Sequence, residues 1–192
     1  NVGVSVNGII DTRDEKPFTS FFDFVARVDS KLVNKRVLEA LVCAGAFDSL
    51  NSGHRAQLLN SIDEAIEYSK SYHNSQNNPM ESLFGGASQN TIIEPKPREF
   101  PEWTPKQRLD KEKEVLNFYI SGHPLESYSP IVNSLSTIVL SDNESNLIGG
   151  KVRICGMFSK VTNKFDRNNK PIAFAEIEDF TGKAECVFWN NS

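Results

Sequence analysis

The carboxylates of this chain include two groups whose spacing could serve metal-ion chemistry. Glu176, Glu178 and Asp179 end a run of alternating residues, and a second group lies among lysines at 110–114. Displacement at phosphorus needs carboxylates that converge on metal ions. Strand alternation instead places Glu176 and Glu178 on one solvated face, and the second group is typical of surface pairs on a helix. Neither group predicts a catalytic centre.

The remaining reactive side chains give no site either. The three histidines lie far apart, and none neighbours a cysteine or carboxylate at ligand spacing. Three widely separated cysteines fit neither a disulfide framework nor a zinc site, so we expect reduced thiols at Cys43, Cys155 and Cys186. No phosphate loop or nucleophile elbow occurs. The sequence therefore predicts a binding module with no catalytic residue, metal or cofactor of its own.

Length and charge limit what such a module binds. The chain has 192 residues, 39% of them hydrophobic, and a net charge of -4. This length suits one large or two small domains, and the negative charge argues against a uniform nucleic-acid coat. Any nucleic-acid contact must be local, at two cationic clusters: Lys31, Lys35 and Arg36, and Lys160, Lys164, Arg167 and Lys170. The alternative for each cluster is a solvated face, which is the commoner case.

No apolar run approaches the roughly 20 residues of a membrane span, and the first residues lack a signal segment. We therefore expect a cytoplasmic protein that does not bind membranes.

A helix that stops at a glycine is the strongest local pattern. Apolar residues from Val37 to Val42 recur at helical spacing, and Gly45 then ends the helix before a second one begins. Glycine tolerates positive φ and close approach, so free amides at this turn could meet a phosphate oxygen. The pattern fits the turn of a helix-hairpin-helix, but it fits an ordinary glycine-capped hairpin as well.

Residues 1–72 read as a helical bundle. Phenylalanines from 18 to 24 form a buried side of one short helix, and His54 to Tyr72 form another helix that Asn51 or Ser52 can cap. Residues 73–101 are a polar linker. Its apolar group at 80–84 is either a docking site for another protein or a segment that packs back on its own domain.

A connector and a sheet follow. Thr104 to Gln107 form a capping box, which predicts a helix to about Ile120 within a connector at 102–149. Alternation from Lys151 onward predicts three antiparallel strands at 150–192. Because an OB-type barrel needs five strands, we expect a truncated barrel. The fold class is therefore α+β in several parts.

Aromatic residues beside the second cationic cluster could stack on unpaired bases. Phe165 stands at a predicted hairpin tip among charges and is the better candidate. For Phe174 the barrel core is the preferred place, with stacking as the alternative.

Taken in order, these segments resemble the C-terminal portion of bacterial DNA polymerase III alpha subunits. The resemblance covers nearly the whole chain and rests on residues 18–24, 34–39, 44–48, the Phe-Tyr-Ile-Ser-Gly-His-Pro-Leu run at 118–125, and the strand pattern at 151–188. It implies a non-catalytic part of a DNA-directed DNA polymerase, because the magnesium-binding palm aspartates of the family would precede Asn1. It also implies that Gly3 ends a first hairpin turn, so the sequence is expected to begin within that motif.

The family further places a sliding-clamp-binding pentapeptide after the helical region. Met80, Ser82, Leu83 and Phe84 occupy that place, with Met80 where glutamine is usual. The expected partners are thus duplex and single-stranded DNA, the sliding clamp and other replisome subunits. The alternative is a protein-interaction scaffold for replisome subunits that binds little DNA itself.

Overall fold

The computed structural model describes residues 6–77, 92–141 and 151–189. The chain divides into two compact units, Asn1–Ile120 and Ser121–Ser192. The first is helical and the second carries an antiparallel sheet, which confirms the α+β class. The predicted connector at 102–149 is split between them, since the helix after Thr104 belongs to the first unit.

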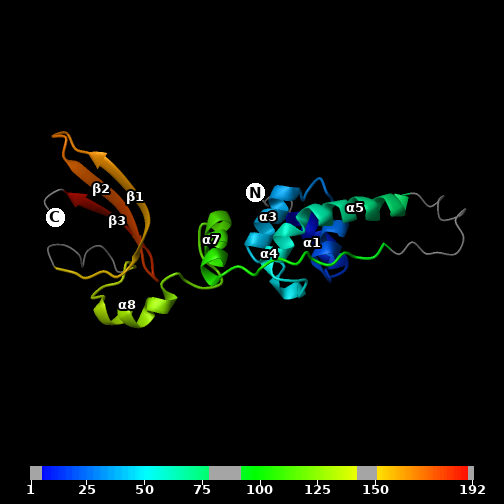
Figure 1. Ribbon diagram of the computed structural model, residues 1–192, viewed down its shortest axis with the longest axis horizontal. Helices are drawn as coiled ribbons and strands as arrows, with labels where there is room; N and C mark the ends of the chain where they lie inside the picture. The colour runs from blue at the N-terminus through cyan, green and yellow to red at the C-terminus, as the bar shows by residue number, and fades with distance from the viewer. Residues whose placement is uncertain (1–5, 78–91, 142–150, 190–192) are drawn as a thin grey trace, which may run out of the picture. The chain divides into compact units, whose positions relative to one another are not determined.

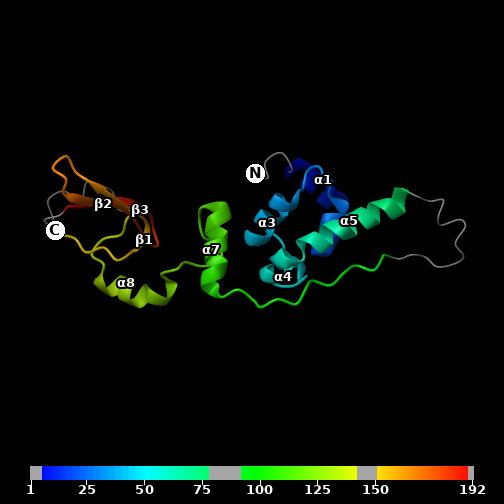
Figure 2. The ribbon, with the colours of Figure 1, turned by 45° about the horizontal axis from the view of Figure 1, so that its top comes forward.

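Six α-helices and one 3-10 helix are described in the first unit. They are α1 (Val6–Glu15), α2 (Phe21–Arg27), α3 (Lys35–Cys43), η1 (Asp48–Leu50), α4 (Arg55–Asn60), α5 (Ile62–Asn77) and α7 (Pro105–Leu116). Figures 1 and 2 show α1, α3, α4 and α5 gathered into one bundle.

Phenylalanine rings hold this bundle together. Phe21, Phe22 and Phe24 of α2 are at most 3% exposed, as the sequence predicted. Phe47, from the loop after α3, meets Phe21 and Phe24 edge to face at centroid distances of 5.1 and 4.9 Å. Each such buried ring contributes about 1.5–3 kcal/mol of transfer free energy. The same cluster includes Leu38, Leu58 and Ile62, so α2, α3, α4 and α5 share one core.

One predicted helix cap is confirmed, and two other predicted helix boundaries are wrong. The Thr104 capping box is present, with Gln107 reaching back to the Thr104 amide at 2.9 Å. The predicted cap at Asn51 or Ser52 was wrong, because Asn51 adopts left-handed φ at the end of η1 and His54 caps α4 instead. The predicted end of α7 near Ile120 was also wrong, because Asn117 takes φ 65° and stops the helix at Leu116.

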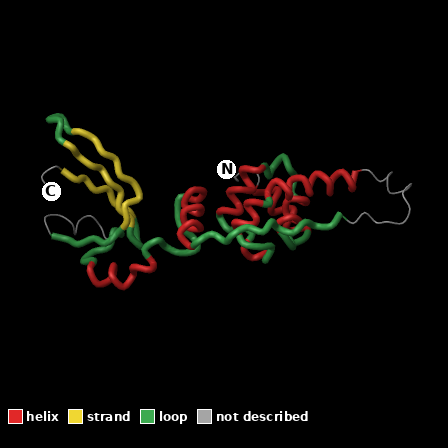
Figure 3. The backbone as a smooth tube through the Cα atoms, in the orientation of Figure 1, coloured by secondary structure: helices red, strands yellow, loops and turns green. Residues whose placement is uncertain are grey.

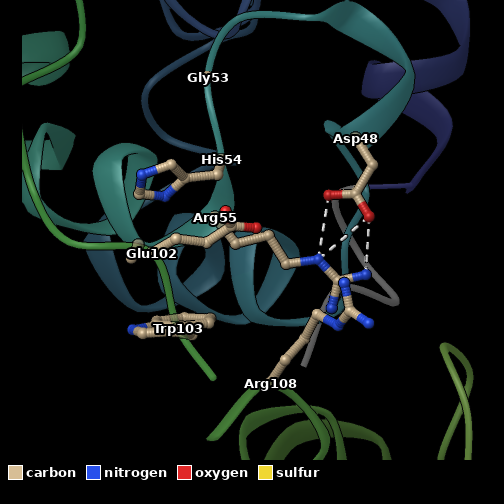
Figure 4. Close-up of a pocket in the computed structure, with 8 residues that line it drawn as sticks. Asp48, Gly53, His54, Arg55, Glu102, Trp103 and Arg108 are labelled. Carbon is tan, nitrogen blue, oxygen red and sulfur yellow. Dashed lines mark hydrogen bonds and ion pairs between the residues drawn. The ribbon is translucent and has the colours of Figure 1, made fainter. Parts of the chain in front are cut away.

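A buried arginine ties the bundle to α7. Arg55 is 8% exposed, and its guanidinium donates to Asp48 at 2.7 Å, to Glu112 at 2.6 Å and to the Cys43 carbonyl at 3.2 Å. Figure 4 shows it facing the Asp48 carboxylate. Hydrogen bonding to Asp48 and then to Glu112 raises the pKa of Arg55 against its desolvation. Glu112 is fully buried and also accepts the Ile120 amide at 2.8 Å, so one network joins α3, η1, α4, α7 and the segment after α7.

The second unit holds short helices and an open sheet. Its elements are η2 (Glu126–Tyr128), α8 (Ser129–Leu135), β1 (Met157–Phe165), β2 (Pro171–Glu178) and β3 (Lys183–Trp189). The strands pair antiparallel in the order β1-β2-β3, which confirms the three predicted strands (Figure 3). An open sheet of this kind is consistent with part of a barrel. The β1 strand begins at Met157, later than the start at Lys151 that the alternation predicts.

Asp179 fastens the turn after β2. Its carboxylate accepts the amides of Thr181 and Gly182 at 2.7 and 2.9 Å, and that of Leu140 at 2.8 Å. Burial by itself raises the pKa of Asp179, but these hydrogen bonds together hold the pKa below its usual value. The carboxylate therefore stabilises the turn.

We predict that Glu112→Ala lowers the free energy of unfolding of the first unit by about 3–5 kcal/mol, because it leaves Arg55 buried with one carboxylate fewer. Urea unfolding followed by the helical circular dichroism signal measures this. The matched control is Glu114→Ala, which removes an exposed partner of Lys111 at 2.9 Å and should cost less than about 1 kcal/mol. Equal effects of the two variants would contradict a structural role for the Arg55 network.

Candidate nucleic-acid interface

The tight turn between α2 and α3 presents exposed backbone and charge. The Val28 amide donates to the Phe24 carbonyl and ends α2, while the Leu32 and Val33 amides both donate to the Asp29 carbonyl. Val28 and Val33 are buried beneath the turn. Residues 29–31 are exposed, so the turn stands on the core and faces outward.

Asn34 caps α3 directly after this turn. Its side chain accepts the Val37 amide at 3.1 Å. The first two helical amides, of Lys35 and Arg36, have no acceptor within the described part of the chain. Amides at a helix start carry partial positive charge and suit an anion such as phosphate.

The three cations of the first predicted cluster lie at or beside this turn and are exposed. Lys31 and Arg36 make no ion pair with the residues that the structure describes. Lys35 is engaged, since its Nζ donates to Asp63 of α5 at 2.7 Å, and this hydrogen bond raises the pKa of Lys35. Lys31 and Arg36 are therefore the cations of this surface that make no ion pair with described residues, and the exposed Asp29 carboxylate lies beside them.

Gly45 follows the end of α3, as the sequence predicts, and forms the glycine cap that was one of the two alternatives for this turn. It adopts φ 81°, and its amide and that of Ala46 donate to Val42 and Leu41 carbonyls at 3.0 Å, as in a Schellman motif. The expected free amides at this turn are thus already bonded. A Cβ at Gly45 would lie 2.2 Å from the Arg55 guanidinium, so glycine is needed there to make room for Arg55.

The α2–α3 turn is not among the turns that the sequence analysis singled out, whereas the Gly45 turn at the other end of α3 is. The available signal was Asn34 as a cap in front of two cations, with Asp29 as a turn residue five positions earlier. Gly3 and the group Met80, Ser82, Leu83 and Phe84 lie outside the described residues.

A small pocket in the first unit carries charges of both signs. It has a volume of about 190 Å³ and is lined by residues that include Asp48, His54, Arg55, Trp103 and Arg108 (Figure 4). Glu102 also lines it, and Arg55 is already bonded to Asp48 and Glu112. Its two carboxylates, Asp48 and Glu102, equal its two arginines in number, so we assign it no phosphate.

Strand register decides which aromatic residue accompanies the second cationic cluster. Thr162 lies opposite Phe174, and Lys160 and Lys164 are two positions away on either side of Thr162 in β1. Residues directly opposite share a face of the sheet, so these lysines and Phe174 lie together. The Lys164 Nζ is 5.4 Å from the centre of the Phe174 ring, within cation–π range.

Phe165 lies on the opposite face of the sheet. By alternation it shares that face with Val161, which is paired with Ala175, and with Phe188, which contacts Phe158 at 6.0 Å. The sequence preference for Phe165 over Phe174 as the partner of the lysines is therefore reversed. Arg167 and Lys170 are exposed in the turn between β1 and β2, where the Asp166 carboxylate accepts the amides of Asn168 and Lys170.

Within residues 6–77, 92–141 and 151–189, no three or more histidine, cysteine, aspartate or glutamate side chains gather closely enough to hold a metal ion. In the same ranges no helix has the length and apolar character needed to cross a membrane.

Comparisons with known proteins found one motif match and several similar proteins that share one name. The family model for the helix-hairpin-helix motif matches residues 3–58, which include both the α2–α3 turn and the Gly45 turn. The DNA polymerase III subunit alpha of Borreliella burgdorferi is 35% identical over 99% of this chain, and that of Caulobacter vibrioides is 32% identical over 98%. The subunit of Mycobacterium tuberculosis is 31% identical over 98%. The chain spans only 16–17% of the length of these relatives.

Proposed function

Because the chain belongs to the DNA polymerase III subunit alpha family as a fragment of that subunit, we propose that it is a non-catalytic DNA-binding and clamp-tethering part of a cytoplasmic replicative polymerase. Nucleotidyl transfer and its magnesium ions belong, in this proposal, to parts of the relatives outside the matched segment. The observation that carries the proposal is the α2–α3 turn, where unbonded amides of α3 lie beside Lys31 and Arg36.

The turn suits the backbone of a DNA duplex. Amides and flexible cations contact phosphate without reading base sequence, and the capped α3 start supplies both. With a net charge of -4, the rest of the chain does not attract DNA uniformly. Duplex binding is therefore confined to a small, oriented surface, which suits a protein that must hold duplex of any sequence.

The sheet suits single-stranded DNA by a different interaction. Phe174 is 41% exposed between Lys160 and Lys164. A ring of this kind stacks on an unpaired base while the lysines neutralise flanking phosphates. In this proposal the sheet guides the unpaired template strand.

The segment 80–84 is the proposed tether to the sliding clamp. Leu83 and Phe84 are the anchors that would fill an apolar pocket of the clamp. Tethering raises the effective concentration of the polymerase at the primer end without new chemistry.

For duplex DNA, we predict that the double variant Lys31→Gln, Arg36→Gln binds about tenfold more weakly at low salt. The slope of log affinity against log salt should fall by about 2, because two phosphate contacts are lost. Fluorescence anisotropy with a labelled duplex measures both quantities. The control with equal charge change is Lys96→Gln, Lys106→Gln, at two exposed lysines outside the turn. Salt-independent or negligible binding by the unaltered chain would favour the replisome scaffold over a DNA-binding module.

For single-stranded DNA, we predict that Phe174→Ala weakens binding of an unpaired oligonucleotide by about 5- to 100-fold, the loss of one stacked base. Phe165→Ala is the matched control on the other face of the sheet and should change affinity less than twofold. A larger loss from Phe165→Ala than from Phe174→Ala would refute the assignment of faces. Circular dichroism of both variants checks that the strands are retained.

For the clamp, we predict that a peptide of residues 78–87 binds a bacterial sliding clamp and that Leu83→Ala, Phe84→Ala in the full chain abolishes the interaction. Isothermal calorimetry measures it, and Met80→Gln should tighten it because the family's usual amide is restored. No binding by the peptide, and no effect of the double variant, would rule out the tether.

A further inference from the structure

A groove beside the α2–α3 turn brings a third element into the candidate interface. Its volume is about 990 Å³, and it lies between α1, the turn and α5. Its floor includes Val25, Val33 and Ile66. Its rim on the turn side is formed by Ser30 and Asn34, both exposed.

The α5 side of the groove is a row of nitrogen donors. Lys70, His73 and Asn74 line it, and all three side chains are exposed. Their spacing of three and four residues places them on one face of the helix. Lys70 makes no ion pair with the residues that the structure describes.

Charge is segregated along α5. Its carboxylates, Asp63, Glu64 and Glu67, fall within its first two turns, and residues 68–77 contain none. Two of them are paired, Asp63 with Lys35 at 2.7 Å and Glu64 with Arg98 at 2.8 Å. The half of α5 that lines the groove is thus the half without negative charge.

The α1 side of the groove has the opposite character. Asp11 lines it, and Arg27 there is already bonded to Asp23 at 3.2 Å and to the carbonyls of Thr12 and Lys16. Asp29 borders the groove from the turn, and its carboxylate accepts the Lys31 amide at 2.8 Å. A phosphate chain is therefore repelled from Asp11 of α1 and from Asp29, and attracted along the half of α5 that carries Lys70.

The position of α5 relative to the α2–α3 turn is fixed by an ion pair and by a shared core. The Lys35 ion pair joins the first residue of α3 to α5, and α2 and α5 pack on the same phenylalanine core, where Phe22 meets Tyr68 edge to face at 6.1 Å. A ligand seated on the turn consequently finds Lys70 and His73 at a defined place.

From this arrangement we infer that the DNA-binding surface extends from the α2–α3 turn onto α5. There Lys70, His73 and Asn74 contact the same sugar–phosphate backbone that the turn binds. The inference rests on the proposed duplex binding. It adds residues that lie outside the helix-hairpin-helix match, which ends at residue 58.

The test compares Lys70→Gln, His73→Gln with the unaltered chain and with Lys106→Gln, an exposed lysine of α7 outside the groove. We expect the α5 double variant to bind duplex about three- to tenfold more weakly, with a salt slope lower by about 1, and Lys106→Gln to match the unaltered chain. Circular dichroism confirms that the helices are retained.

A photo-crosslinking residue at position 74 should also capture the labelled duplex, whereas the same residue at position 106 should not. If the Lys31→Gln, Arg36→Gln variant loses affinity while the α5 variant and position 74 behave like their controls, the extension is refuted and the hairpin site stands. If the unaltered chain binds no duplex, the proposed function and the extension both fall.

Discussion

The helical unit depends on the burial of one guanidinium. Arg55 reaches Asp48, Glu112 and the Cys43 carbonyl, and Glu112 passes the connection on to the Ile120 amide. A charge in this position is tolerated only because both carboxylates and the carbonyl replace the water that Arg55 gives up. The network also explains Gly45, since any side chain there would occupy the place of the guanidinium. A glycine that resembles a ligand-binding feature is therefore a packing requirement.

The candidate DNA contacts are local because the chain as a whole is acidic. The α2–α3 turn offers backbone amides and the cations Lys31 and Arg36. The phenylalanine core packs beneath the turn, so the turn faces solvent. Lys35 lies on the same surface but forms an ion pair with Asp63 of α5. This ion pair orients α3 against α5. Attraction for phosphate then comes from a few placed groups and not from net charge.

In the sheet, the alternation of side chains along each strand decides which residues lie together on one face. Thr162 opposite Phe174 puts the ring with Lys160 and Lys164, and Phe165 falls among apolar residues on the other face. A register shifted by one residue would exchange the two faces. Phe165 and Phe174 are both phenylalanines near lysines in the sequence, so only pairing distinguishes a stacking surface from an apolar one.

The sequence by itself determined the α+β class, the phenylalanine side of α2, the Thr104 cap and the three strands, because these follow from periodicity and capping within a few residues. It also carried the family resemblance that the relatives bear out. The end of α7 is a local left-handed cap at Asn117. Tertiary structure alone decided that Glu112 is buried under Arg55, that Gly45 makes room for a side chain ten residues later, and that Lys70 shares a groove with the α2–α3 turn. These three features depend on contacts between residues distant in sequence, and local patterns carry no information about which distant partner is present.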